Sequence, residues 1–339
     1  MLMTSHLTDE AYQSYILQGV SRTFALTIPQ LPPNLCQVVS NGYLLCRIAD
    51  TIEDEPQLTP AQKRFFSQQF IQVVAGELAA ETFSQALAPR LSEKTLAAEK
   101  DLVVNTPRVI RLTHSFKASQ RAALYRCVRI MAKGMAHFQQ NHTVAGLKNL
   151  AEMNHYCYCV AGVVGEMLTE LFCDYSSYIA QNQVTLQALA VSFGQALQMT
   201  NILKDIWEDR QRGACWLPQE IFTPVGFDLR NLSPTDYDPA FGKGLAELIR
   251  ITRTHLHNAL RYILLIPAHE VGIRRFCLWA LGMAILTLQR INQRRDFCRG
   301  QQVKISRRSV KATILVSNLF TRSDISLRAL FYLLTRGLP

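Results

Sequence analysis

Two short acidic segments hold the side chains best suited to bind a metal ion. Residues 50–54 read Asp-Thr-Ile-Glu-Asp, and residues 205–209 read Asp-Ile-Trp-Glu-Asp. Because side chains four positions apart on a helix project from the same face, the two aspartates of each segment should point together, with the glutamate beside them. Carboxylate ligands with no His or Cys among them favour Mg²⁺ or Mn²⁺. The metal ligands that this pattern predicts are Asp50, Glu53, Asp54, Asp205, Glu208 and Asp209.

Either acidic segment alone would be interpreted as a solvated helix face. Like charges at this spacing destabilise an isolated helix by about 0.2–0.5 kcal/mol per pair, and bound cations would offset that repulsion. Apolar residues precede or interleave both segments, namely Cys46, Ile48, Ile202, Leu203, Ile206 and Trp207. We therefore predict that the acids line a cavity, where Mg²⁺ would bridge to a diphosphate and ease ionisation of a carbon–diphosphate bond. Arg22, Arg47 and Lys204 could add hydrogen bonds to the leaving group, although each of them taken alone is more often a surface cation.

The sequence around these segments has the patterns of an all-α fold. Apolar residues recur at three- and four-residue spacing over residues 122–138 and 186–197, as on one face of a helix. Alternating strand patterns are scarce, and no repeat or long linker divides the chain, so we predict one all-α domain over residues 1–339. Pro and Gly cluster where helices should stop, at residues 29–33, 56–60, 213–218 and 224–239.

Composition narrows the class of protein. The chain has 339 residues, 48% hydrophobic and 18% charged, so it can bury a large core and is not disordered. Its net charge of +10 favours anionic partners, but it carries no recognition motif for nucleic acid. Nine cysteines without framework spacing favour a reducing compartment, and residues 1–10 lack the pattern of a secretory signal, so we expect a cytoplasmic protein.

Two C-terminal stretches raise the question of membrane contact. Residues 276–289 are apolar but too short to span a bilayer comfortably, so we predict a buried core helix. The segment of about residues 310–339 mixes leucines with basic residues, which is typical of helices that lie on a membrane surface and also of a packed terminal helix. We predict peripheral attachment to a membrane through this segment, because Arg322, Arg328 and Arg336 stand among leucines.

Four blocks in the same order resemble the squalene/phytoene synthase family, the head-to-head prenyl transferases, and together they cover nearly the whole chain. They are residues 21–24 (Ser-Arg-Thr-Phe), Tyr43 and Arg47 leading into the first acidic segment, residues 156–165, and residues 198–209 followed by Leu-Pro-Gln-Glu at 217–220. The resemblance implies an isoprenoid synthase helical bundle with a central cavity, whose acidic helices face each other across the mouth. It also implies two molecules of farnesyl or geranylgeranyl diphosphate as substrates.

The resemblance further implies roles for single residues. The four aspartates of the acidic segments would bind Mg²⁺ and act in catalysis, and Asn201 would contact metal or diphosphate. Tyr156 would act near the carbocation or in proton removal, although a Tyr in this Val-, Ala- and Gly-rich stretch is otherwise a packed core residue. Gly162 and Gly165 mark either close helix contacts or an approach of the substrate chain. The residues expected at the diphosphate are Ser21, Arg22, Thr23, Phe24, Tyr43, Arg47, Asn201, Lys204 and Arg212.

Two positions depart from the family pattern. Lys204 stands where many relatives carry Arg, and an Arg commonly found after the glycine that follows the second segment is replaced by Ala214. Arg210 and Arg212 lie close by in the sequence, and one of them could take its place.

The choice of product depends on residues 300–308. This segment looks like the Val-Lys-Ile-basic segment with which squalene synthases bind NADPH, and phytoene synthases generally lack it; without the resemblance it is equally a solvated basic loop. We therefore favour squalene, formed through presqualene diphosphate. The alternatives are phytoene or dehydrosqualene without reduction, an enzyme that stops at presqualene diphosphate, and an inactive assembly or scaffold protein. The residues expected to bind NADPH are Asn292, Lys304, Arg307 and Arg308.

Overall fold

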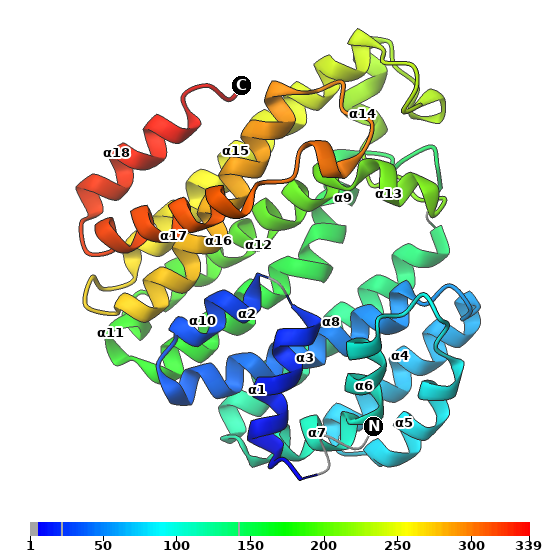
Figure 1. The fold of residues 1–339 in the computed structure, drawn as a ribbon, viewed down its shortest axis with the longest axis vertical. Helices are drawn as coiled ribbons and strands as arrows, with labels where there is room; N and C mark the ends of the chain where they lie inside the picture. The colour runs from blue at the N-terminus through cyan, green and yellow to red at the C-terminus, as the bar shows by residue number, and fades with distance from the viewer. Residues whose placement is uncertain (1–5, 22, 142) are drawn as a thin grey trace. The chain divides into compact units, whose positions relative to one another are not determined.

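The computed structural model describes residues 6–21, 23–141 and 143–339, and for residues 140 and 141 it describes the backbone alone. Every element named in these parts of the chain is a helix, and their only β-type pairing is an isolated bridge between Leu147 and Pro218. The all-α prediction is confirmed (Figure 1). The chain divides into two compact units, unit 1 over residues 1–140 and 166–181, and unit 2 over residues 141–165 and 182–339. That the whole chain is one domain stays a prediction.

Unit 1 contains the helices up to α8 and, after the first residues of α10, the short α11. Its elements are α1 (Asp9–Val20), α2 (Phe24–Thr27), η1 (Ile28–Gln30), α3 (Pro33–Asp54), α4 (Pro60–Ala75), α5 (Ala80–Leu87), η2 (Ala88–Arg90), α6 (Ala97–Val104), α7 (Thr106–Ser115), α8 (Ala118–Asn141) and α11 (Ser177–Ala180).

Unit 2 contains the remaining helices. They are α9 (Leu150–Cys157), η3 (Tyr158–Gly162), α10 (Val163–Tyr175, whose later residues belong to unit 1), α12 (Gln183–Lys204), α13 (Ile206–Gln211), α14 (Gln219–Phe222), η4 (Thr223–Val225), η5 (Leu229–Asn231), α15 (Pro239–Leu265), α16 (Val271–Gln293), η6 (Gly300–Gln302), α17 (Arg307–Phe320) and α18 (Asp324–Thr335). Helices end or begin at each predicted cluster of Pro and Gly.

Helix α3 is the element of unit 1 that carries the first acidic segment. It begins at Pro33, a position where the missing N–H is no loss and the fixed φ suits the first turn. Its inner face packs the fully buried Leu44, Leu45 and Ile48, whereas Asp50 is only partly buried near the end of the helix. Helices α1, α4, α6 and α7 contact α3 and can bring side chains to this end.

Helix α12 has the corresponding role in unit 2, where it lies along α15 and against η3 (Figure 1). The contact is close, because a Cβ on Gly165 would lie 2.4 Å from the backbone oxygen of Ala190, and one on Gly194 would lie 2.3 Å from that of Ala161. Only glycine leaves room for backbones at this distance. Of the two interpretations of Gly165, the close contact between helices is therefore confirmed.

One turn of this contact is a π-helix, η3, which the sequence patterns did not predict. It follows α9 directly and ends where the N–H of Val163 bonds to the carbonyl of Tyr158. Such an insertion shifts the faces of the helix on either side of it and is frequent at functional sites. It begins two residues after Tyr156.

Helix α16 confirms the predicted core helix but is longer than residues 276–289. It continues through Arg274 and Arg290, and 61% of its most apolar window is buried inside the protein. By length and composition alone, α16 and the run from Leu150 to Tyr175 could cross a membrane, a test that buried helices of soluble proteins also pass. Arg274 itself is 1% exposed.

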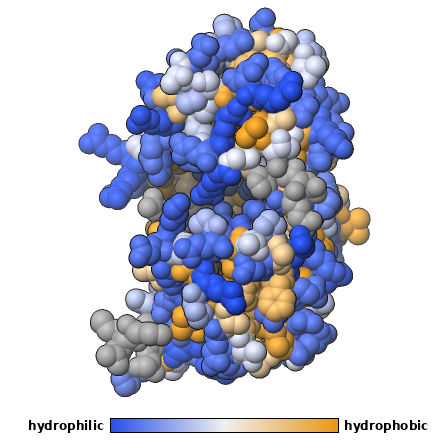
Figure 2. Space-filling view, turned by 90° about the vertical axis from the view of Figure 1, so that its right-hand side faces the viewer, coloured by the Kyte–Doolittle hydropathy of each residue, from blue (hydrophilic) through white to orange (hydrophobic). Residues whose placement is uncertain are grey.

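The outer surface is mixed. On the face drawn in Figure 2 hydrophilic residues predominate, and hydrophobic residues form separate patches. All nine cysteines are free thiols, most of them buried.

Candidate functional site

The first acidic segment lies on one continuous helix, as predicted, at the C-terminal end of α3. Arg47, one turn earlier, places its Nη1 atom 3.7 Å from a carboxylate oxygen of Asp50 and 3.7 Å from one of Glu99. The Nη2 atom of Arg47 donates to the Tyr43 hydroxyl at 2.8 Å. A single guanidinium thus links the predicted diphosphate contacts to the predicted metal ligands.

The carboxyl groups of this segment are electrostatically crowded. Burial, together with the charges of Asp54 and Glu99, raises the pKa of Asp50 to about 6 although Arg47 opposes the rise. Burial and the charges of Asp54 and Asp50 raise the pKa of Glu53 to about 8. Since the Asp50 side chain keeps 33% of its surface exposed, an ion from solvent can reach it. A divalent cation would relieve this crowding by lowering both pKa values.

The residues on either side of position 22 contact Tyr43, which lies one turn before Arg47 on α3. The ring of Phe24 lies 5.3 Å from that of Tyr43, and the backbone N–H of Phe24 donates to the hydroxyl oxygen of Ser21 at 2.9 Å. The Tyr43 hydroxyl in turn donates to the carbonyl of Val20 at 3.1 Å. Thr23 is exposed beside them. Arg22 lies outside the described residues.

Three further residues of unit 1 belong to this site and were missed by the sequence reasoning. Glu99 of α6 shares Arg47 with Asp50. Lys63 of α4 donates to the backbone carbonyl of Glu53, and the Gln139 amide donates to its carboxylate at 3.3 Å. Gln139 lies 86 positions from Glu53, and Lys63 lies ten positions from it on another helix, so no spacing within one helix could have signalled these contacts.

The second acidic segment differs from the prediction, because it is not one continuous helix. Helix α12 ends at Lys204, and α13 begins at Ile206, with Asp205 at the bend between them (φ −100°, ψ 16°). The N–H of Asp209 still donates to the carbonyl of Asp205 at 2.9 Å, so the four-residue spacing is kept across the bend. The bend is followed at once by Trp207, whose indole N–H donates to the buried carbonyl of Phe297 at 2.7 Å.

Basic residues surround this segment in different ways. The ammonium of Lys204 lies 3.1 Å from an Asp205 carboxylate oxygen and 3.2 Å from the Asn201 amide oxygen. Burial raises the pKa of Asp205, while Lys204 and Arg212 oppose the rise. Arg210 donates to the carbonyls of Val144, Leu229 and Arg230. Arg210 therefore holds loops together, and the exposed Arg212 is the better placed of the two to contact a ligand.

Glu208 makes a contact that the sequence did not predict. Its Oε1 atom accepts the N–H of Gly300 at 3.2 Å, which joins the second acidic segment to the start of the basic segment 300–308. Its other oxygen, Oε2, is buried and has no hydrogen-bond partner in the described part of the chain. Such an oxygen is available to a cation.

The donor set fits Mg²⁺ even though it is not a closed cage. Among the described residues no three His, Cys, Asp or Glu side chains form a ready-made metal site. Mg²⁺ normally binds through one or two carboxylates, several waters and substrate phosphates, so a closed set is not required. Burial raises the pKa of Asp50, Glu53 and Asp205, and one buried oxygen of Glu208 has no hydrogen-bond partner among the described residues, so a bound cation would stabilise the charged form of these carboxylates.

Tyr156 is 6% exposed and lies flat on the ring of Trp216, with ring centroids 4.1 Å apart and planes 7° apart. The packed-core interpretation therefore holds for its ring. Trp216 was missed as a partner because it is far along the sequence, in the loop before α14.

The residues predicted to bind NADPH differ in their exposure and in their hydrogen bonds. Lys304, Arg307 and Arg308 are exposed, and the two arginines occupy the first turn of α17. Two cations at a helix N-terminus add to its positive potential, which favours a phosphate. Asn292, by contrast, donates to the carbonyl of Gly337 at 3.1 Å and accepts from Arg295. Its amide is thus already engaged by the C-terminal residues.

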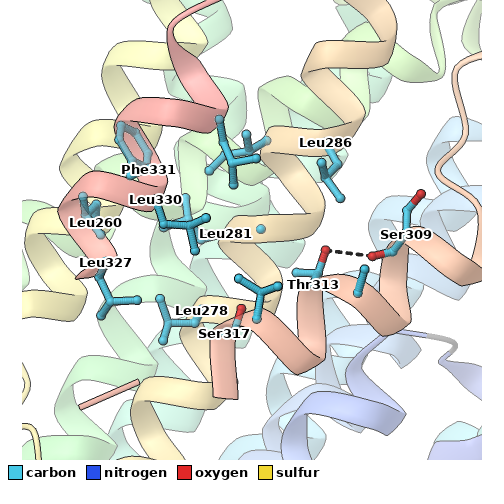
Figure 3. Close-up of a pocket in the computed structure, with 15 residues that line it drawn as sticks. Leu260, Leu278, Leu281, Leu286, Ser309, Thr313, Ser317, Leu327, Leu330 and Phe331 are labelled. Atoms are coloured by element: carbon cyan, nitrogen blue, oxygen red, sulfur yellow. Dashed lines mark hydrogen bonds between the residues drawn. The ribbon is translucent and has the colours of Figure 1, made fainter. Parts of the chain in front are cut away.

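An apolar pocket of about 290 Å³ lies elsewhere in unit 2, and none of the predicted site residues lines it. Figure 3 shows leucines of α16 and α18 pointing into it, among them Leu281 and Leu330, while Thr313 of α17 donates to the carbonyl of Ser309 at 2.9 Å. The pocket is therefore closed on several sides by the C-terminal helices.

Comparison with known proteins agrees with these motifs. The family model for squalene/phytoene synthase matches residues 17–309. The squalene synthase of Eremothecium gossypii is 29% identical over 275 residues, which are 80% of this chain and 60% of that protein. The squalene synthase of Schizosaccharomyces pombe is 28% identical over 317 residues, which are 92% of this chain and 66% of that protein. The chain thus spans 60–66% of the length of these curated relatives.

Solved structures show the same fold. A complex of TcSQS with a ligand has a TM-score of 0.76 and 22% sequence identity, covering 98% of this chain and 92% of that one. A dehydrosqualene synthase in complex with a ligand has a TM-score of 0.68 and 21% identity, covering 93% and 97%. These likenesses confirm the all-α architecture.

Proposed function

Because the chain belongs to the squalene/phytoene synthase family, we propose that it is a Mg²⁺-dependent prenyl transferase that makes squalene. It would condense two molecules of farnesyl diphosphate to presqualene diphosphate, which it would then reduce with NADPH. The observation that carries the proposal is the two crowded acidic segments, each of which has a cation in an ion pair with its first aspartate.

The residues that would hold metal and diphosphate follow from the contacts above. Bound Mg²⁺ would neutralise charge that develops on the diphosphate leaving group. Arg47 would donate a hydrogen bond to the diphosphate, while Tyr43 keeps its guanidinium in place through the 2.8 Å contact. Lys204 would act as the point charge of the second segment. The proposed metal ligands are Asp50, Glu53, Asp54, Asn201, Asp205, Glu208 and Asp209.

Tyr156, stacked on Trp216, would act near the carbocation or in proton removal. A ring held by stacking presents its polar end in one direction, and aromatic faces attract a cation. The buried apolar residues around α9 and α12 would exclude the water that would otherwise quench the cation.

NADPH would supply the hydride that ends the reaction. Lys304, Arg307 and Arg308 would bind its phosphates at the N-terminus of α17. Asn292 would have to release Gly337 before it could contact the nucleotide.

Purified protein incubated with farnesyl diphosphate and Mg²⁺, with and without NADPH, tests the proposal by product analysis. Squalene that forms only with NADPH, together with presqualene diphosphate without it, is the expected result. Dehydrosqualene or phytoene formed irrespective of NADPH would contradict the squalene assignment and leave the condensation intact. No product under any condition would favour the scaffold alternative.

We also propose peripheral contact with a membrane through α17 and α18. Residues 307–339 contain six basic residues and one acidic residue, and Leu315, Leu319 and Ile325 are 72%, 75% and 83% exposed. Exposed leucines among cations favour an anionic lipid surface. Co-sedimentation with vesicles of anionic lipid, but not of neutral lipid, is expected, and Leu319→Glu should reduce it whereas Leu96→Glu, at a site in unit 1 that is 62% exposed, should not.

A further inference from the structure

The basic segment 300–308 is attached to the second acidic segment by two hydrogen bonds. The Glu208 carboxylate accepts the N–H of Gly300 at 3.2 Å, and the Trp207 indole donates to the carbonyl of Phe297 at 2.7 Å. The rings of Trp207 and Phe297 also meet edge to face, with centroids 6.4 Å apart. Neighbouring residues of α13 therefore hold both ends of the stretch 297–300.

The contact with Glu208 depends on a glycine. A Cβ at position 300 would lie 2.9 Å from Glu208 Oε1 and 2.9 Å from the backbone oxygen of Lys204. The φ angle of Gly300 lies outside the left-handed region, so the requirement is one of space. The residue is glycine because the carboxylate and the end of α12 approach its backbone closely.

We propose that Glu208 is a positioning residue, which through Gly300 fixes the basic segment 300–308 in place for its ligand. The N–H of Gly300 is the first of η6, and η6 leads within a few residues to the exposed Lys304 and to the two arginines that begin α17. A carboxylate that accepts a backbone N–H makes a stronger bond than a neutral acceptor does. When the bond is lost, Glu208 no longer holds η6 against α13. Lys304, Arg307 and Arg308 are then no longer held in one arrangement. The effect on nucleotide rests on the proposed use of NADPH, whereas the effect on segment order does not.

Three variants and two measurements test this inference. Glu208→Ala removes the acceptor, and Glu208→Gln keeps an oxygen at the same position. Gly300→Ala adds a Cβ that pushes residue 300 away from Glu208. Glu152→Ala is the matched control, because the Glu152 carboxylate also accepts a backbone N–H in unit 2, that of Lys148 at 2.7 Å. Hydrogen exchange of the peptide containing residues 297–303 reports segment order, and NADPH fluorescence titration without metal reports nucleotide binding.

Glu208→Ala and Gly300→Ala should speed exchange in this peptide roughly tenfold or more, the scale expected for a lost hydrogen bond to a charged group. The same two variants should weaken NADPH binding by a similar factor, and Glu208→Gln, which keeps an acceptor without the charge, should recover part of both effects. Unchanged exchange in Glu208→Ala, or no recovery in Glu208→Gln, would overturn the inference. If exchange responds as expected but NADPH binds neither wild type nor variants, the positioning role stands and the proposed reduction fails.

Discussion

Arg274 offers the sharpest test of how unit 2 is held together, because a guanidinium that is 1% exposed stands on the core helix α16. Its Nε donates to the carbonyl of Ile266 at 2.8 Å, and its Nη1 donates to the carbonyl of Thr321 at 3.0 Å and to Asp324 Oδ1 at 2.7 Å. The last two acceptors form the corner between α17 and α18. Arg274 therefore fastens the C-terminal helix pair to the core.

Replacing Arg274 by Met keeps much of the apolar stem and removes all three bonds. Two buried carbonyls lose their donor, at about 1–3 kcal/mol each. The ion pair adds at most about 1 kcal/mol, because the Asp324 side chain is 47% exposed. Leaving the guanidinium out of the core offsets part of this cost. We expect the free energy of unfolding to fall by about 3 kcal/mol.

Urea unfolding measures that loss, and limited trypsin digestion at Arg322 reports whether the corner opens. Both should change in Arg274→Met and neither in Arg328→Met, which removes an exposed arginine of α18. A loss below about 1 kcal/mol with unchanged cleavage would refute the reasoning, since it would mean that the two carbonyls find other donors at no cost.

Three further outcomes are expected. Asp50→Asn should lower kcat for product formation from farnesyl diphosphate about a hundredfold or more, the scale for losing one charge-stabilising group; unchanged activity would disprove the metal assignment. Burial lowers the pKa of His255, so its neutral form stabilises the fold above about pH 6.5. That contribution is lost as pH falls through the lowered pKa, and it amounts to about 1.4 kcal/mol for each pH unit between the unfolded and folded pKa values. His255→Gln should therefore flatten the fall in unfolding free energy between pH 7 and 5, and an unaltered slope would count against it. Gly165→Ala should destabilise by about 1–3 kcal/mol in urea unfolding, because its Cβ would lie 2.4 Å from Ala190 O; Gly337→Ala, with open space around it, should be neutral.

Local patterns were enough to predict most of the helices. The apolar spacing over residues 122–138 and 186–197 falls inside α8 and α12, and the acidic residues of the first segment share α3. These predictions succeed because helix periodicity and helix ends depend on residues only a few positions apart.

Predictions from local sequence patterns failed where a residue far along the chain determines the local structure. The bend at Asp205 is accompanied by the bond from Trp207 to Phe297, ninety positions further on. Likewise, the stacking of Tyr156 on Trp216 joins two separate elements. The fully buried Arg274 lies just before a stretch read as purely apolar, and its acceptors come from a corner that no spacing rule connects to it. Tertiary contacts of this kind have no signature in short windows.

The repulsion between carboxylates is offset in different ways in the two acidic segments. In the first, a continuous helix keeps the acids together, and Arg47 must divide its charge between Asp50 and Glu99, so the pKa of Asp50 stays raised, at about 6. In the second, Lys204 lies against Asp205, and one oxygen of Glu208 accepts the N–H of Gly300. More of the repulsion in the second segment is thus relieved by the protein itself. The first segment therefore has the greater electrostatic need for a cation, and the second has the closer connection to the rest of its unit.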